Sequence, residues 1–142
     1  MKRYLFDTNA ISLWFDNSLP EKWLRQWKEI KMGNSSLLLF EQLISEAYYK
    51  NIQKYGNKKS RDNIFFLKSF PNSYIYKIKD KDALSAGDIK VKNNKYKLSL
   101  VDCFLIAIAR TNSAEIFTTD PSIRDVAKKM KISVNYFPLK KS

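Results

Sequence analysis

Short apolar segments alternate with helical patterns along this chain, and this alternation constrains its fold more than any other feature. Strands are expected at residues 3–6, 74–78, 115–119 and 132–137, while residues 37–40 form either a strand or the lead-in to a helix. Helices are expected at residues 10–15, from Pro20, from Phe40, from Ser60, and at residues 80–91, 99–109 and 121–130. Strands separated by helices form mainly parallel sheets with helices on both faces. The sequence therefore predicts an α/β fold.

The length of 142 residues fits a single domain spanning residues 1–142. No run of about 18 apolar residues is present, so no membrane-spanning helix is expected. The apolar stretch at the N-terminus is too short for a secretion signal and is ended by Asp7. We therefore expect a cytoplasmic protein that does not contact a membrane.

The absence of histidine excludes several kinds of catalytic chemistry. It removes histidine general bases, histidine-based zinc sites and the Ser-His and Cys-His nucleophile pairs. Cys103 is the only cysteine, so no disulfide can form within the chain. Catalysis must therefore depend on carboxylates, lysine, tyrosine, hydroxyl groups or a metal ion held by oxygen atoms.

Three aspartates occupy positions that would bring them to one edge of a parallel sheet. Asp7 directly follows the first strand, Asp120 directly follows the strand at 115–119, and Asp102 lies near the start of an apolar helix. Two carboxylates 4 Å apart repel each other by about 4 kcal/mol at an effective dielectric constant near 20. Either a proton or a cation must relieve this repulsion. Oxygen ligands without histidine favour Mg²⁺ or Mn²⁺.

Each of these aspartates also has a purely structural interpretation as a helix cap. Asp7 can cap the helix that follows it, and Asp120 precedes Pro121, which suits a helix start. Ser99 and Asp102 match the spacing of a capping box. In this alternative the chain is a non-catalytic nucleic-acid-binding or protein-interaction domain.

Four segments, in order along the chain, together resemble the PIN domain family of nucleases. They are Phe6-Asp7-Thr8-Asn9, Leu43-Ile44-Ser45-Glu46, Leu98-Ser99-Leu100-Val101-Asp102 and Phe117-Thr118-Thr119-Asp120. The resemblance implies a doubly wound α/β/α sandwich with a four- or five-stranded, mainly parallel sheet. It also implies an endoribonuclease that uses an acidic quartet with Mg²⁺ or Mn²⁺ and leaves 3′-hydroxyl and 5′-phosphate ends.

The family pattern assigns roles to individual residues of this chain. The catalytic and metal-binding quartet would be Asp7, Glu46, Asp102 and Asp120. Supporting polar residues would be Thr8, Asn9, Ser99 and Thr119, with Thr118 as an alternative to Thr119. The helical wheel turns Glu46 away from the apolar face of its helix, so Glu41 is kept as the reserve for the fourth acid.

The basic composition fits a polyanionic substrate, because 26 lysines and arginines face 14 acids, giving a net charge of +12. An acidic site that cuts RNA needs basic surroundings. Candidate RNA contacts in the stretches around 50–61 and 90–97, and on the Asp102 helix, are Lys50, Lys54, Lys92, Lys95 and Arg110. The chain length is similar to that of VapC-type toxins, which implies a cognate antitoxin partner and a homodimer.

Overall fold

A five-stranded parallel sheet forms the centre of the computed structural model, which describes residues 1–139. The strands are β1 (Lys2–Phe6), β2 (Ser35–Leu39), β3 (Ser73–Ile75), β4 (Glu115–Thr118) and β5 (Val134–Tyr136). Their order in the sheet is β3-β2-β1-β4-β5, and every pairing between neighbours is parallel. The expected parallel α/β sheet is confirmed, although the last three residues of the expected domain lie outside the described part.

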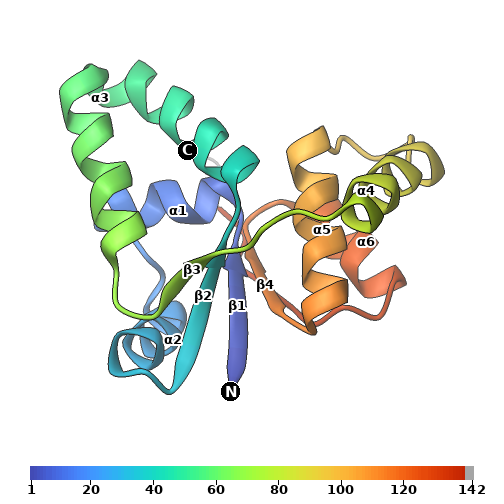
Figure 1. Cartoon of the computed structure of the whole chain (residues 1–142), viewed down its shortest axis with the longest axis horizontal. Helices are drawn as coiled ribbons and strands as arrows, with labels where there is room; N and C mark the ends of the chain where they lie inside the picture. The colour runs from blue at the N-terminus through green and yellow to red at the C-terminus, as the bar shows by residue number, and fades with distance from the viewer. Residues whose placement is uncertain (140–142) are drawn as a thin grey trace.

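Helices cover both faces of this sheet (Figure 1). They are α1 (Thr8–Phe15), α2 (Glu21–Met32), α3 (Glu41–Ser69), α4 (Asp80–Lys92), α5 (Leu100–Asn112) and α6 (Pro121–Lys129). The first three connect β1 to β2 and β2 to β3 on one face, and the last three connect β3 to β4 and β4 to β5 on the other. Within residues 1–139, no helix combines the length and apolarity needed to cross a membrane.

The structure decides between strand and helix for residues 37–40, and it changes the bounds of other expected elements. The segment left open at 37–40 belongs to strand β2, whose residues are all buried. The strands expected at 74–78 and 132–137 are shorter, at Ser73–Ile75 and Val134–Tyr136. The two helices expected from Phe40 and Ser60 are both present as the two arms of α3, and the break between them lies at Gly56, before the expected cap Ser60. Gly56 has a φ of 81°, a left-handed conformation that glycine adopts without steric penalty.

Aromatic side chains fill the core beside the two central strands. The rings of Phe6 and Phe117 stack with their centroids 4.5 Å apart, and Trp23 of α2 packs edge-on against both. Trp27 adds a further edge contact to Phe6. Phe6 directly precedes Asp7, and Phe117 directly precedes Thr118. The aromatic packing therefore holds the backbone immediately before these two polar residues.

Replacing Phe117 by alanine should destabilise the protein strongly, because Phe117 is fully buried and contacts three other aromatic rings. The expected loss is roughly 3–5 kcal/mol in the free energy of unfolding, measured by urea denaturation. Phe65→Ala is the matched control, because Phe65 is 67% exposed, and it should change stability by no more than about 0.5 kcal/mol. Equal losses in both variants would contradict the described core.

Candidate active site

Asp7 lies at the carboxyl edge of the sheet, immediately after β1. Its side chain is buried, and its Oδ1 accepts a hydrogen bond of 2.8 Å from the backbone N–H of Ala10, which caps α1. Its Oδ2 accepts a hydrogen bond from the hydroxyl group of Thr118. Both carboxylate oxygens are therefore held in place by the surrounding structure.

Thr118 connects Asp7 to Asp120 across neighbouring strands. Its hydroxyl donates to Asp7 and accepts a 2.9 Å hydrogen bond from the backbone N–H of Asp120. Asp120 in turn caps α6, because its Oδ1 accepts a 2.8 Å hydrogen bond from the backbone N–H of Ser122. One buried hydroxyl thus fixes two of the acids relative to each other.

Asp102 occupies the first turn of α5 and forms the capping box expected with Ser99. The backbone N–H of Ser99 donates to Asp102 Oδ2 at 2.9 Å, and the backbone N–H of Asp102 donates to Ser99 Oγ at 3.1 Å. The second oxygen of Asp102 takes part in no hydrogen bond described for residues 1–139. Asp102 is therefore anchored through one oxygen, as Asp120 is.

Glu46 reaches the same edge from the other face of the sheet. It lies in the first half of α3, its residue is only 9% exposed, and its Oε1 accepts a hydrogen bond from the hydroxyl of Thr8. Lys50, one turn further along α3, forms an ion pair with Glu46 at 3.7 Å. The helical wheel predicted that Glu46 points away from the apolar face of its helix, and so did not predict its burial. Glu46 is buried because α1 packs against α3 and supplies the hydroxyl of Thr8 as a hydrogen-bond donor.

These side chains surround one hollow of about 240 Å³. We call it the acidic hollow. Its lining residues are Asp7, Thr8, Asn9, Glu46, Tyr49, Lys50, Lys97, Ser99, Asp102, Asp120 and Ile123. All four expected acids are thus brought together at the carboxyl edge of the sheet, whereas Glu41 lines other surface hollows.

The acids that cap helices also face the acidic hollow, so the two interpretations drawn from the sequence do not exclude each other. Asp7, Asp102 and Asp120 each give one oxygen to a backbone N–H in the first turn of a helix or just before it. That hydrogen bond fixes the orientation of the whole carboxylate. The N-terminal ends of α1, α5 and α6 also contribute partial positive charge here, which favours anionic side chains.

Burial and mutual repulsion raise the pKa values of two of these carboxylates. Burial, with the charges of Asp102 and Asp120, raises the pKa of Asp7 to about 7, although hydrogen bonds from Thr118 and Ala10 oppose the shift. Burial also raises the pKa of Asp102, and the charges of Glu46 and Asp120 add to this. A cation bound in the acidic hollow would favour the ionised form of both carboxylates and so lower these pKa values again.

The donor atoms of this hollow suit a hard divalent cation. They are carboxylate and hydroxyl oxygens, which are the ligands that Mg²⁺ and Mn²⁺ prefer. Within residues 1–139, however, no three acidic side chains stand close enough together to ligate one bare ion. Mg²⁺ keeps several water ligands and uses only one or two carboxylates. The residues therefore fit a partly hydrated ion better than one enclosed by protein ligands.

Several of the expected RNA contacts lie away from the acidic hollow. Lys54 pairs with Asp16, and the ammonium of Lys95 lies 5.3 Å from the ring centroid of Tyr96. Lys92 and Arg110 line a different hollow. Of the five expected contacts, only Lys50 lines the acidic hollow.

Sequence reasoning missed Tyr49 and did not resolve the choice between two threonines. Tyr49 is 51% exposed at the acidic hollow, and its position next to Lys50 on the helix of Glu46 was an available signal. Thr118, rather than Thr119, contacts the acids. The hydroxyl of Thr119 is buried and has no hydrogen-bond partner among the described residues.

A family model described as "PIN domain" matches residues 4–129, which contain all four acids. The fold and the acidic edge define a doubly wound α/β domain with a carboxylate site. The chain belongs to the PIN domain family. No curated protein matches its sequence.

Solved structures of VapC toxins have the same fold. The VapBC2 structure from Rickettsia felis, bound to a promoter DNA fragment, aligns with a TM-score of 0.74 at 11% identity over 94% of this chain and 98% of that one. VapC20 of Mycobacterium tuberculosis, a sarcin-ricin loop cleaving toxin, gives a TM-score of 0.68 at 10% identity over 86% and 93%. DNA-bound VapBC from Salmonella typhimurium gives 0.71 at 14% identity over 96% and 98%. The fold of this chain is thus VapC-like.

Stability without metal should depend on pH through Asp7. The folded protein holds the Asp7 proton up to about pH 7, whereas the unfolded chain loses it near the ordinary pKa of 3.8. This contribution is complete below pH 3.8 and is lost as the pH rises to 7. In EDTA, the wild type should therefore lose on the order of 4 kcal/mol relative to Asp7→Asn across this range. Urea denaturation at several pH values measures the difference.

Asp62→Asn is the control for this experiment, because Asp62 is exposed on α3 and the substitution removes the same charge. Its pH dependence should follow that of the wild type. A pH dependence in Asp7→Asn that matches the wild type would show that Asp7 has an ordinary pKa.

Proposed function

We propose that this protein is an Mg²⁺- or Mn²⁺-dependent endoribonuclease and the toxin of a toxin–antitoxin pair. The observation that carries the proposal is the convergence of four carboxylates on one hollow at the carboxyl edge of the sheet. Membership of the PIN domain family supports a nuclease, and the likeness to a toxin described as cleaving the sarcin-ricin loop supports RNA as substrate. The net charge of +12 favours a polyanion.

The acidic residues would hold the metal ion and a water molecule. Asp102 and Asp120 each have one oxygen beyond their capping hydrogen bond, and Asp7 and Glu46 flank them. A divalent cation bound there would lower the pKa of water and polarise the phosphoryl group. Thr118 keeps Asp7 and Asp120 at a fixed separation through its two hydrogen bonds.

Basic side chains at the rim would guide RNA to this negative hollow. Lys50 and Lys97 line it together with the four acids, and both are exposed. Their charges offset the repulsion between the carboxylates and the phosphates of RNA. Lys50 is partly engaged by Glu46, so Lys97 is the freer of the two to contact a phosphate.

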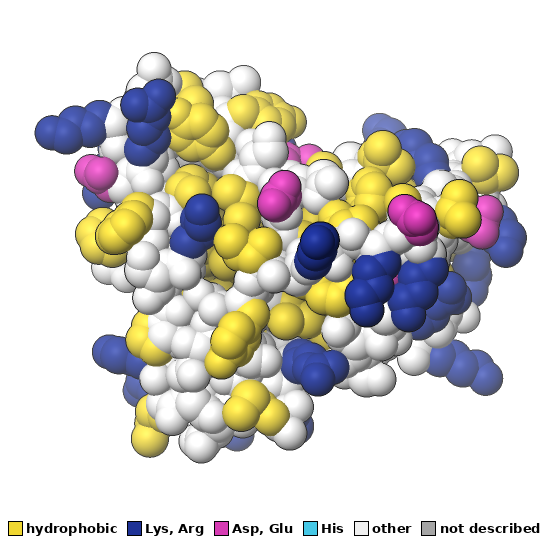
Figure 2. Space-filling model, in the orientation of Figure 1, with side chains coloured by type: hydrophobic (Ala, Val, Ile, Leu, Met, Phe, Trp, Pro, Cys, Tyr) yellow, Lys and Arg dark blue, Asp and Glu magenta, His cyan; other side chains and the backbone are white. Residues whose placement is uncertain are grey.

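The expected partners of the protein are a cognate antitoxin and a second copy of the chain. The antitoxin proposal is supported by structural neighbours that are VapBC complexes. Phe65 and Phe66 of α3 are 67% and 61% exposed, which suits a contact with another chain. Figure 2 shows hydrophobic side chains gathered over the α3 side of the molecule.

A second candidate function remains, because all three aspartates do cap helices. In that case the acids only stabilise the fold, and the basic surface binds nucleic acid without cutting it. The arrangement of the acids in residues 1–139, where no three can ligate one bare ion, is compatible with this alternative. Cleavage assays separate the two functions.

Purified protein should cleave a labelled RNA pool with Mg²⁺ or Mn²⁺ and should lose this activity in EDTA. Asp102→Asn and Asp120→Asn should lower the cleavage rate by ~100-fold or more, since even the partners of metal ligands typically contribute 10- to 100-fold. Both substitutions keep an oxygen that can cap the helix, so the variants should stay folded. Gel electrophoresis of the products measures the rates.

Asp62→Asn serves as the control, because it removes an exposed charge outside the acidic hollow. It should cleave at the wild-type rate. Cleavage that persists in EDTA, or in both site variants, would contradict the metal–carboxylate mechanism. RNA binding without any cleavage would establish the second candidate function.

A further inference from the structure

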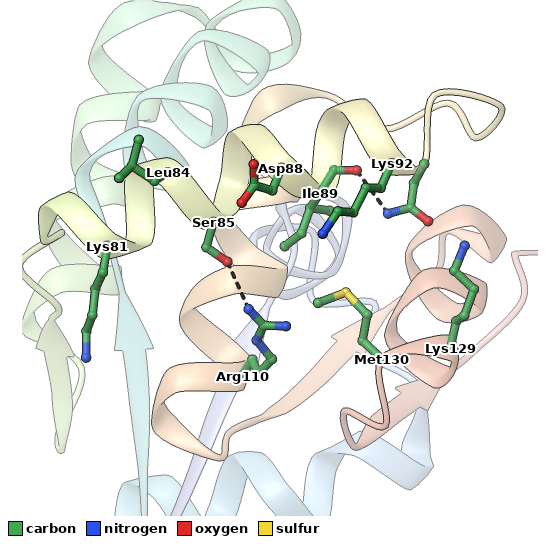
Figure 3. A pocket seen from close by; sticks show the side chains of 10 residues that line it. Lys81, Leu84, Ser85, Asp88, Ile89, Lys92, Arg110, Lys129 and Met130 are labelled. Carbon is green, nitrogen blue, oxygen red and sulfur yellow. Dashed lines mark hydrogen bonds between the residues drawn. The ribbon is translucent and has the colours of Figure 1, made fainter.

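A second hollow, of about 570 Å³, lies between α4 and the C-terminal end of α6 (Figure 3). We call it the basic hollow. Its lining includes Lys81, Lys92, Arg110 and Lys129, with Asp88 as its single acid. These cations come from three different helices, so the fold and not one lysine-rich helix brings them together.

Cations of the basic hollow are available to a ligand. Lys92, Arg110 and Lys129 are exposed, and none of them forms an ion pair within residues 1–139. Among the described residues, Arg110 donates to the neutral hydroxyl of Ser85, at 3.2 Å, and to no carboxylate. Figure 3 shows the side chains of Lys92 and Arg110 directed toward the space beside Met130. Figure 2 likewise shows Lys and Arg side chains gathered over the α4 and α5 side of the molecule.

Asn93 adds a neutral polar side chain to the lining of the basic hollow. It is only 4% exposed and lines the basic hollow, and its Nδ2 donates to the carbonyl of Ile89 at 2.9 Å. Its Oδ1 is buried and has no hydrogen-bond donor in the described part of the chain. The exposed cations, and not this buried oxygen, are therefore the groups that a ligand in the basic hollow can contact.

The segment 93–99 joins the basic hollow to the acidic one. Asn93 lines the former, while Lys97 and Ser99 line the latter. Between them lies Tyr96, whose ring centroid is 5.3 Å from the ammonium of Lys95 and 5.5 Å from that of Lys129. Arg110 and Asp102 belong to the same helix, about 12 Å apart along its axis. A basic path therefore leads from one hollow to the other over a distance that a few nucleotides can span.

We propose that the basic hollow binds the sugar-phosphate backbone of the RNA substrate at a distance from the bond that is cut, with Lys92, Arg110 and Lys129 contacting phosphates. The inference rests on the proposed function in that the same RNA strand enters the acidic hollow. Exposed cations along a path suit a polymer that passes over the surface, and each phosphate contact releases condensed counterions.

The test is RNA binding by a variant that removes the three cations, Lys92→Gln/Arg110→Gln/Lys129→Gln. Its control is Arg25→Gln/Lys28→Gln/Lys31→Gln, which removes the same charge from the exposed surface of α2 on the other face of the sheet. Fluorescence anisotropy with labelled single-stranded RNA in EDTA measures affinity without cleavage. Thermal unfolding confirms that both variants are folded.

The hollow variant should bind long RNA on the order of tenfold more weakly than the control at low salt, because it loses direct phosphate contacts. The slope of log affinity against log salt should fall by about 2, since each neutralised phosphate of a single strand contributes roughly 0.7. Cleavage of an RNA too short to reach the basic hollow should keep the wild-type rate. RNA binding in EDTA and RNA cleavage are measured separately. Weaker binding by the hollow variant in a protein that never cleaves RNA would therefore contradict only the proposed function and not the assignment of the basic hollow.

Equal losses of affinity in the hollow variant and the α2 control would overturn the proposal, because the effect would then come from net charge alone. A DNA strand of the same sequence that binds as tightly as RNA, with the same loss in the hollow variant, would overturn the assignment to RNA. Equal effects on short and long substrates would place these cations at the cutting site instead.

Discussion

The parallel pairing of β1 with β4 determines where the polar ends of both strands lie. Phe6 is in register with Phe117, and the backbone N–H of Asp7 donates to the carbonyl of Phe117 at 3.0 Å. Directly beyond this register, the hydroxyl of Thr118 lies between Asp7 and Asp120 and bonds to both. The stacked rings of Phe6 and Phe117 bury the strands immediately before these polar residues. A slip by one residue would place Phe6 and Phe117 on opposite faces of the sheet, so their rings would no longer stack and the contact of Thr118 with Asp7 would be lost.

In Asp102 and Asp120, one carboxylate oxygen caps a helix and the other is available to a metal ion, whereas both oxygens of Asp7 accept hydrogen bonds. The capping hydrogen bonds stabilise α1, α5 and α6, and they also restrict how the acids can turn. Burial raises the pKa of Asp7 to about 7, and repulsion from the rigidly held Asp102 and Asp120 adds to this shift. The site therefore stores an electrostatic penalty that a divalent cation can relieve. Local helix stability and the proposed chemistry depend on the same side chains.

Much of this arrangement could be predicted from the sequence, because strand ends and cap residues are local signals. The strand before Asp7, the strand before Asp120 and the capping box of Asp102 all lie where their local patterns place them. Glu46 could not be placed from its own helix, since its burial depends on Thr8 of α1. The choice of Thr118 over Thr119 likewise depends on the neighbouring strand. The sequence named Lys92 and Arg110 as RNA contacts, but it could not place them beside Lys129, because the basic hollow combines three helices that are distant in sequence.

Calorimetric titration of Mn²⁺ into the wild type and into Asp102→Asn tests most directly whether an aspartate that caps a helix also binds the metal ion. Mn²⁺ should bind saturably to the wild type and markedly more weakly to the variant. In EDTA the variant should be at least as stable as the wild type, because asparagine can still accept the hydrogen bond from Ser99 and carries no charge that burial disfavours. Equal Mn²⁺ affinity in the two proteins, or no binding by the wild type, would contradict this role of Asp102.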